Sequence, residues 1–110
     1  MKYNFFLRLK TNETEWINMG GNHIISWNVR DLIEASSGWF IYNEEKLGLA
    51  SDLVPTLQKG IFELNQSSQV YADYEILHGF GTIKSVLKFY KELLYDCQQY
   101  PYTELCGSIS

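Results

Sequence analysis

The residue types that could carry out catalysis are few in this chain and lie far apart in the sequence. There are two histidines, His23 and His78, and two cysteines, Cys97 and Cys106. No Cys-x-x-Cys, His-Glu-x-x-His or Gly-x-Ser-x-Gly motif is present. Cys97 falls on an apolar stripe of helical spacing, where a cysteine is usually an inert small hydrophobe. We therefore predict no catalytic residues, no metal and no cofactor. A site built from His78 with Cys97, or with tyrosine side chains, is the enzymatic alternative.

One short segment could bind an anion. It reads His78-Gly79-Phe80-Gly81-Thr82 and precedes a segment with helical spacing. Two glycines before a helix allow backbone N–H groups to turn toward a phosphate or carboxylate, and the helix dipole favours negative charge there. No lysine follows in the phosphate-binding position, and a tight turn that needs positive φ explains the glycines more simply. Binding of a small ligand by His78, Gly79, Gly81 and Thr82 is therefore the alternative to our main prediction.

Aromatic residues are the most unusual feature of the composition. Three Trp, eight Tyr and six Phe make up 15% of the chain. Tyr and Trp combine an apolar ring with a polar tip, which suits them to protein interfaces. A small domain also fills its core with large side chains, so each ring has a purely structural interpretation as well. We predict that a partner protein contacts five of these residues, namely Trp16, Trp27, Trp39, Tyr42 and Tyr74.

Charge and length exclude several classes of protein. Nine Lys and Arg against thirteen Asp and Glu give a net charge of -4, whereas nucleic-acid binders and polybasic membrane binders need clustered cations. No apolar run approaches the roughly 20 residues of a membrane span, and no signal peptide precedes the first predicted strand. Two cysteines are too few for a disulfide framework, which is typical of a cytoplasmic protein with reduced thiols. A homodimer through exposed rings or an open strand edge is compatible with the sequence.

The first half of the chain predicts a hairpin and a helix. Apolar and polar residues alternate over 2–10, turn-forming residues follow at 11–14, and 16–19 can return as a second strand. That strand is expected to end at Gly20-Gly21-Asn22. A helix is expected to begin near Ser26 and to end at Gly38, because glycine suits the left-handed position after a helix. Residues 39–42 fit either a short strand or an apolar loop that plugs the core, and we favour the loop.

The second half predicts two long helices and a final strand. Apolar residues recur at helical spacing over 50–64 and again over 83–97, where Thr82 is the expected N-cap. Gly60, inside the first of these stripes, indicates close approach of another backbone or of a bulky aromatic side chain. Residues 70–74 add one further helical turn, and 102–109 form a strand that can join the hairpin.

These elements predict a single α+β domain over residues 1–110. One layer is a small antiparallel sheet, made of the N-terminal hairpin and the C-terminal strand, and three helices cover its apolar face. The helices at 50–64 and 83–97 are expected to pack antiparallel. Their apolar stripes should share one core with Phe5, Leu7 and Leu9.

Several motifs recur at a recognisable spacing along residues 22–109. They are Asn28-Val29, Leu32, Gly38-Trp39, Glu44-Glu45, Gly48, Gly60, Leu64, Gly79-Phe80-Gly81-Thr82 and Cys97. This layout resembles a group of small proteins from phage and bacterial accessory genomes, a group without a settled activity. The pattern of that group runs Asn-x-Thr-His-Asn-Leu, Met-Ala, a Gly-Leu-x-x-Leu helix, Asn-Gly-Trp-Gly-Thr and a closing helix with a cysteine.

The chain departs from that pattern at three positions, with Ile24 in place of Asn, Trp27 in place of His and Phe80 in place of Trp. The resemblance implies an immunity-type or phage anti-defence protein that works by binding, and it implies no particular reaction. The negative charge, the aromatic content and the lack of a catalytic set agree with that implication. We therefore predict a non-enzymatic intracellular protein that binds another protein.

Overall fold

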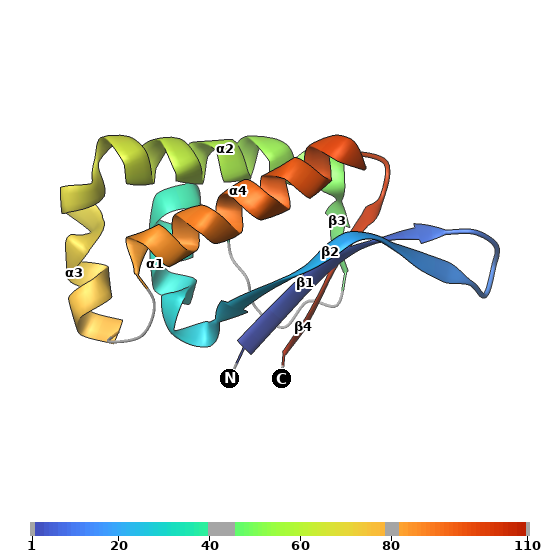
Figure 1. Ribbon diagram of the computed structural model, residues 1–110, viewed down its shortest axis with the longest axis horizontal. Coiled ribbons are helices and arrows are strands. Elements are labelled where there is room, and N and C mark those ends of the chain that lie inside the picture. The colour runs from blue at the N-terminus through green and yellow to red at the C-terminus, as the bar shows by residue number, and fades with distance from the viewer. Residues whose placement is uncertain (1, 40–45, 79–81, 110) are drawn as a thin grey trace.

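The computed structural model of the chain describes residues 2–39, 46–78 and 82–109, and within these ranges it contains four strands and four α-helices (Figure 1). In chain order the elements are β1 (Lys2–Lys10), β2 (Trp16–Ser26), the 3-10 helix η1 (Trp27–Val29), α1 (Arg30–Ser37), β3 (Lys46–Leu49), α2 (Ala50–Gln66), α3 (Ser68–His78), α4 (Ile83–Gln99) and β4 (Glu104–Ile109). The predicted α+β class is confirmed. The described part of the chain has one strand and one α-helix more than the sequence predicted.

All strand pairs in the sheet are antiparallel, and the strand order is β2-β1-β4-β3. β4 lies beside β1 with Tyr3 opposite Ile109, so the first and last strands run side by side (Figure 1). The prediction that the C-terminal strand joins the hairpin is therefore confirmed. The sequence did not predict β3, which has only four residues; Gly48 within it adopts φ +104°.

β2 continues through Gly20-Gly21 instead of ending there, so the predicted end of this strand is wrong. Phe5 pairs with His23 and Leu7 pairs with Met19, which leaves three residues of β2 opposite a single residue of β1. Gly20 adopts φ +75°, a conformation that glycine reaches without strain. The glycines therefore form a bulge, which bends the strand and preserves the pairing on both sides.

The helices begin and end for local reasons that the sequence indicates only in part. The Ser26 side chain accepts a hydrogen bond from the Asn28 N–H, so it caps η1, and α1 starts four residues later at Arg30. Gly38 ends α1 at φ +78°, as predicted. The single turn expected at 70–74 is the middle of a separate helix, α3. None of the helices in the described ranges combines the length and the apolar character that crossing a bilayer requires.

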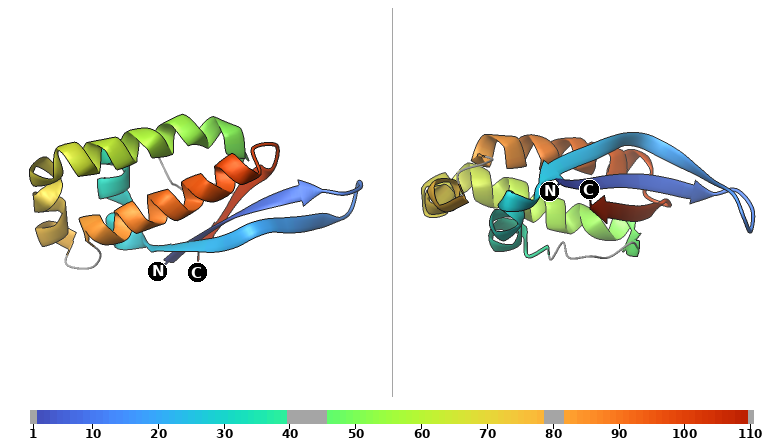
Figure 2. Two further views of the ribbon diagram at one scale, coloured as in Figure 1. Left: turned by 45° about the horizontal axis from the view of Figure 1, so that its top comes forward. Right: turned by 90° about the horizontal axis from the view of Figure 1, so that it is seen from below.

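The core lies between the sheet and the helices. α2 and α4 run antiparallel beside each other, as predicted, and α1 and α3 lie toward the end of this pair that is remote from the hairpin tip (Figures 1 and 2). Tyr3, Phe5 and Leu7 of β1 are buried against this layer. Leu9 is only half-buried and stands outside the core, contrary to the prediction, because β1 and β2 extend past the helices at that point (Figure 1). The molecule is consequently elongated, with extents of 47 × 26 × 18 Å.

Candidate protein-binding site

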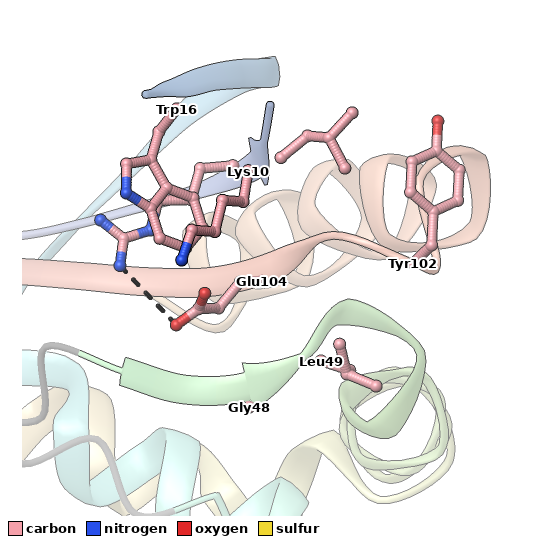
Figure 3. Close-up of a pocket in the computed structure, with 8 residues that line it drawn as sticks. Lys10, Trp16, Gly48, Leu49, Tyr102 and Glu104 are labelled. Atoms are coloured by element: carbon pink, nitrogen blue, oxygen red, sulfur yellow. Dashed lines mark ion pairs between the residues drawn. The ribbon is translucent and has the colours of Figure 1, made fainter. Parts of the chain in front are cut away.

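An open groove of about 540 Å³ lies where the hairpin leaves the helical layer (Figure 3). In this view Trp16 lies at the left and Tyr102 at the right. Glu104 and Leu49 lie between them, lower in the picture. We call this surface the Trp16 groove. It is lined by Arg8, Leu9, Lys10, Trp16, Gly48, Leu49, Tyr102 and Glu104.

Strand register brings most of the Trp16 groove together. Lys10 of β1 is the register partner of Trp16 on β2. Arg8 pairs with Glu104 of β4, and Glu104 in turn pairs with Leu49 of β3. Because Arg8 and Lys10 are two residues apart on one strand, they share a face of the sheet, opposite to the face of the buried residue Leu7. The groove therefore draws on all four strands.

Backbone hydrogen bonds fix the far end of the groove. The Ala50 N–H donates to the Thr103 carbonyl over 2.8 Å, and the Ser51 N–H donates to the Pro101 carbonyl over 3.1 Å. These carbonyls supply acceptors for two of the N–H groups that every helix leaves unpaired at its start. The start of α2 is thereby joined to the turn before β4. This junction places Leu49 and Tyr102 on the same groove, and their residues are 48% and 57% exposed.

Two cations surround the Trp16 ring. The guanidinium carbon of Arg8 lies 3.8 Å from the ring centroid, and Lys10 Nζ lies 5.5 Å from it. Arg8 Nη2 is also 3.7 Å from Glu104 Oε1, which is an ion pair without hydrogen-bond geometry. A cation over the face of a tryptophan is attracted by the ring quadrupole. Arg8 therefore holds the indole in place, and the described lining of the groove carries two positive charges against one carboxylate.

Two of the other predicted contact residues, Trp39 and Trp27, pack against side chains of the protein itself. Trp39 is 8% exposed and packs on Phe5 and Phe89, with centroid distances of 4.9 and 6.3 Å. Trp39 is therefore a core residue, which corrects its assignment to a partner surface. Trp27 is half-buried, stacks on Tyr3 at 4.8 Å and has the Arg30 guanidinium 4.7 Å from its centroid.

Tyr74, the other aromatic candidate that the structure describes, does not line the Trp16 groove. Tyr74 is half-buried on α3, near Tyr71, and it lines a small depression with Asp31 and Glu34 of α1. Tyr42 lies outside the described residues. Of the four predicted contacts that lie within the described ranges, Trp16 lines this groove and the other three do not.

Three backbone N–H groups at the start of α4, the alternative ligand site, are already paired. Thr82 caps the helix as predicted, because its hydroxyl accepts from the Ser85 N–H, and the Ser85 hydroxyl accepts from the Thr82 N–H. The Ile83 N–H donates to the carboxylate of Glu75. A bound anion would compete with a negative charge already at the helix N-terminus. Gly79 and Gly81 lie outside the described residues, as does the side chain of His78.

Sequence reasoning missed a buried hydrogen bond between a histidine of β2 and an aspartate of α4. His23 Nε2 lies 2.6 Å from Asp96 Oδ2, and the Gly21 N–H donates to the same oxygen over 2.9 Å. Both side chains are largely buried. The shallow depression beside the pair is lined further by Asn22, Lys91, Glu92 and Tyr95, so its described lining holds no Ser, Thr or Cys for the histidine to activate.

The two cysteines take no part in a site in the described structure. Cys97 and Cys106 are both buried and form no disulfide. Burial, and to a lesser extent the charge of Asp96, raises the pKa of the Cys97 thiol to about 12, so the thiol stays protonated. Cys97 lies near the end of α4, about 20 Å along the helix from its start at Ile83. His78 comes before that start in the sequence, on the side of α4 away from Cys97. The described residues contain no group of three or more His, Cys, Asp or Glu that could hold a metal ion.

The signals for the Trp16 groove in the sequence were weak. Arg8 and Lys10 stood on the polar side of the first predicted strand, which is the usual pattern of a solvated face. Leu49 preceded a helix, and Tyr102 began a predicted strand, so neither suggested a surface contact. Comparison with known proteins finds no matching protein-family model, no matching curated protein and no matching solved structure.

Proposed function

We propose that this chain is a non-enzymatic interaction protein and that it binds another protein through the Trp16 groove. The observation that carries the proposal is that Trp16, held by Arg8, lines one groove together with two exposed side chains, those of Leu49 and Tyr102. Trp, Tyr and Arg are the residue types that contribute most to binding energy at protein interfaces. Apolar side chains gathered in an exposed hollow are typical of interaction surfaces.

A protein partner suits this groove better than a small ligand. The groove is shallow and runs across four strands, whereas small-molecule sites usually enclose most of the ligand. The helix start at Thr82, which was the alternative ligand site, gains no support from its geometry. Its N–H groups at Ile83 and Ser85 are bonded to the Glu75 carboxylate and the Thr82 hydroxyl.

We also propose a cytoplasmic location and a role in conflict between phages and bacteria. Two buried cysteines that form no disulfide support a reducing compartment. The resemblance carried by the Gly79-Phe80-Gly81-Thr82 motif supports a toxin or a defence protein as the partner.

The test pairs two exposed aromatic residues, one inside the groove and one outside. Tyr102→Ala removes a ring that is 57% exposed in the groove, and Phe62→Ala removes a ring that is 61% exposed on α2, twelve residues beyond its start. Proteins are captured from an extract of the native host with the full chain, Tyr102→Ala and Phe62→Ala. A candidate that depends on Tyr102 is then purified, and its dissociation constant is measured with each variant.

We expect a one-to-one complex whose affinity falls about thirtyfold in Tyr102→Ala, or about 2 kcal/mol, and stays within about twofold in Phe62→Ala. Trp16→Ala should act like Tyr102→Ala, and thermal melting checks that each variant is folded. The proposal is overturned if purified candidates bind all variants equally. It is also overturned if light scattering shows that the groove joins two copies of this chain.

A further inference from the structure

The guanidinium of Arg8 is held in place, and none of the hydrogen bonds found among the described residues uses it as a donor. Its carbon lies over the Trp16 ring, and its nearest carboxylate oxygen, Glu104 Oε1, is 3.7 Å from Nη2. Nε likewise has no hydrogen-bond partner among the described residues. An arginine presents five N–H donors in a planar fork that matches a carboxylate. Arg8 is therefore oriented by its neighbours, and its ion pair with Glu104 leaves its hydrogen-bond donors available for a further carboxylate.

A second cation adds to this capacity. Lys10 Nζ lies 5.5 Å from the same ring centroid, and Lys10 is exposed on the rim of the groove. Lys10 forms no ion pair with any residue in the described ranges. The groove thus has a local excess of positive charge in a chain whose net charge is -4. This contrast favours an occupant whose negative charge meets these two side chains.

The opposite end of the groove has a different chemistry. Leu49 and Tyr102 leave apolar surface exposed there, and the junction of α2 with the turn before β4 fixes both residues. An occupant that lies along the groove meets cations at one end and apolar surface at the other. An extended polypeptide has this combination when an acidic residue and an apolar residue are close in its sequence.

We propose that the Trp16 groove recognises a segment of its partner protein that carries an Asp or Glu beside an apolar residue. The carboxylate binds Arg8 and Lys10, and the apolar side chain packs on Leu49 and Tyr102. This inference rests on the proposed function and specifies the chemistry of the partner. It assigns specificity to Arg8 and Lys10, which the strand pattern alone would leave on a solvated face.

The fold supplies a matched control for Arg8. Arg30 also lies over a tryptophan, with its guanidinium carbon 4.7 Å from the Trp27 centroid, and it is 3.8 Å from a carboxylate oxygen of Asp31. Arg30 does not line the Trp16 groove. Arg8→Gln and Arg30→Gln therefore remove the same kind of cation–ring contact, one inside the groove and one outside it.

The experiment uses a display library of random ten-residue peptides selected on the full chain. We expect enriched peptides to place Asp or Glu next to an apolar residue. Arg8→Gln and Lys10→Gln should each weaken binding of a synthesised peptide, Arg8→Gln by about tenfold, while Arg30→Gln changes it by less than about twofold. Binding should weaken as salt is raised from about 0.05 M to about 0.5 M, because screening shortens the range of the charges.

Three results would overturn the recognition chemistry. They are enriched peptides without carboxylates, equal affinity for Arg8→Gln and the unchanged chain, and no enrichment at all. If a purified partner still depends on Tyr102 in those cases, binding through the groove stands and the acidic–apolar motif is rejected. If neither partner nor peptide depends on Tyr102, both proposals fail.

Discussion

Tyr90 is the residue at which three helices meet. Its ring is fully buried, its hydroxyl lies 2.7 Å from Ser36 Oγ, and it donates to the Ile33 carbonyl over 3.1 Å. The ring also lies directly against the backbone of α2 at Gly60. One side chain of α4 thus contacts α1 through hydrogen bonds and α2 through packing. Sequence reasoning anticipated the close approach at Gly60, because a glycine inside an apolar stripe needs a packing reason.

Adding a methyl group at Gly60 tests this contact. A Cβ there would lie 2.5 Å from Tyr90 Cε2, and the buried ring has no solvent to move into. We expect Gly60→Ala to lower the free energy of unfolding by about 1–3 kcal/mol, as overpacked cores do. Urea titration measures the change. Gly21→Ala is the control, since a Cβ at Gly21 meets nothing within 4 Å. Equal stability of the two variants would contradict the contact.

Alkaline pH should destabilise the protein through the same side chain. Burial raises the pKa of Tyr90 from 10.0 to about 12, although hydrogen bonds from Ser36 and Ser37 oppose the shift. The folded state therefore favours the neutral phenol, and this contribution is complete below pH 10.0 and lost as pH rises through about 12. The loss is on the order of 3 kcal/mol.

The melting temperatures of the unchanged chain and of Tyr90→Phe are compared between pH about 9 and about 12. Cys97 contributes in the same direction, because burial also raises its pKa to about 12. The unchanged chain should therefore lose stability more steeply than Tyr90→Phe, which keeps Cys97 and lacks the phenol. Parallel curves for the two proteins would show that Tyr90 does not titrate in this way.

At the scale of elements, the bulge in β2 is shaped around one carboxylate of α4. Asp96 accepts from the Gly21 N–H and pairs with His23. A Cβ at Gly20 would lie 2.6 Å from Asp96 Cγ, so glycine is required there for packing as well as for its positive φ. The two glycines predicted a strand end because glycine usually weakens strands. The partner that turns them into a bulge lies some seventy-five residues away and leaves no local signal.

Removing the Asp96 carboxylate should therefore weaken the contact between β2 and α4, because it removes the two hydrogen bonds that connect them. Asp96→Ala leaves the buried His23 side chain and the partly buried Gly21 N–H without their acceptor, and we expect it to cost about 3 kcal/mol in urea unfolding. The Gly21 amide should also exchange its hydrogen faster. Asp73→Ala, which removes an exposed carboxylate on α3, should change stability by less than about 0.5 kcal/mol. Similar losses in both variants would contradict a specific contact.

At the scale of the whole molecule, the sequence predicted the layers more completely than the binding surface. The spacing of apolar residues within a segment indicates which face of a helix or strand is buried, so α2, α4 and β1 could be predicted. The Trp16 groove joins Arg8 and Trp16 to Leu49 and Tyr102, and their proximity depends on the strand order β2-β1-β4-β3. Strand order arises from long-range pairing, which no local pattern of residues reports.

The global fold should also shield both thiols. Cys97 and Cys106 are buried in α4 and β4, which belong to different layers of the domain. The pKa of Cys97 is raised to about 12, so at pH about 8 its thiol is ionised in roughly one molecule in ten thousand. We expect iodoacetamide to label neither cysteine in the folded protein and both in urea, as read by mass spectrometry. Rapid labelling of the folded protein would mean that the core opens far more easily than its packing implies.

The pairing of Tyr3 with Ile109 has a practical consequence for anchoring the molecule. About 17 Å of strand lies between Tyr3 and Arg8, so the Trp16 groove is remote from the place where β1 starts and β4 finishes. A tether that leads from the start of β1 or from the end of β4 would hold the molecule on a sensor chip or bead with the groove turned outward. Because Tyr3 and Ile109 pair, tethers from these two strand ends should give the same binding curve.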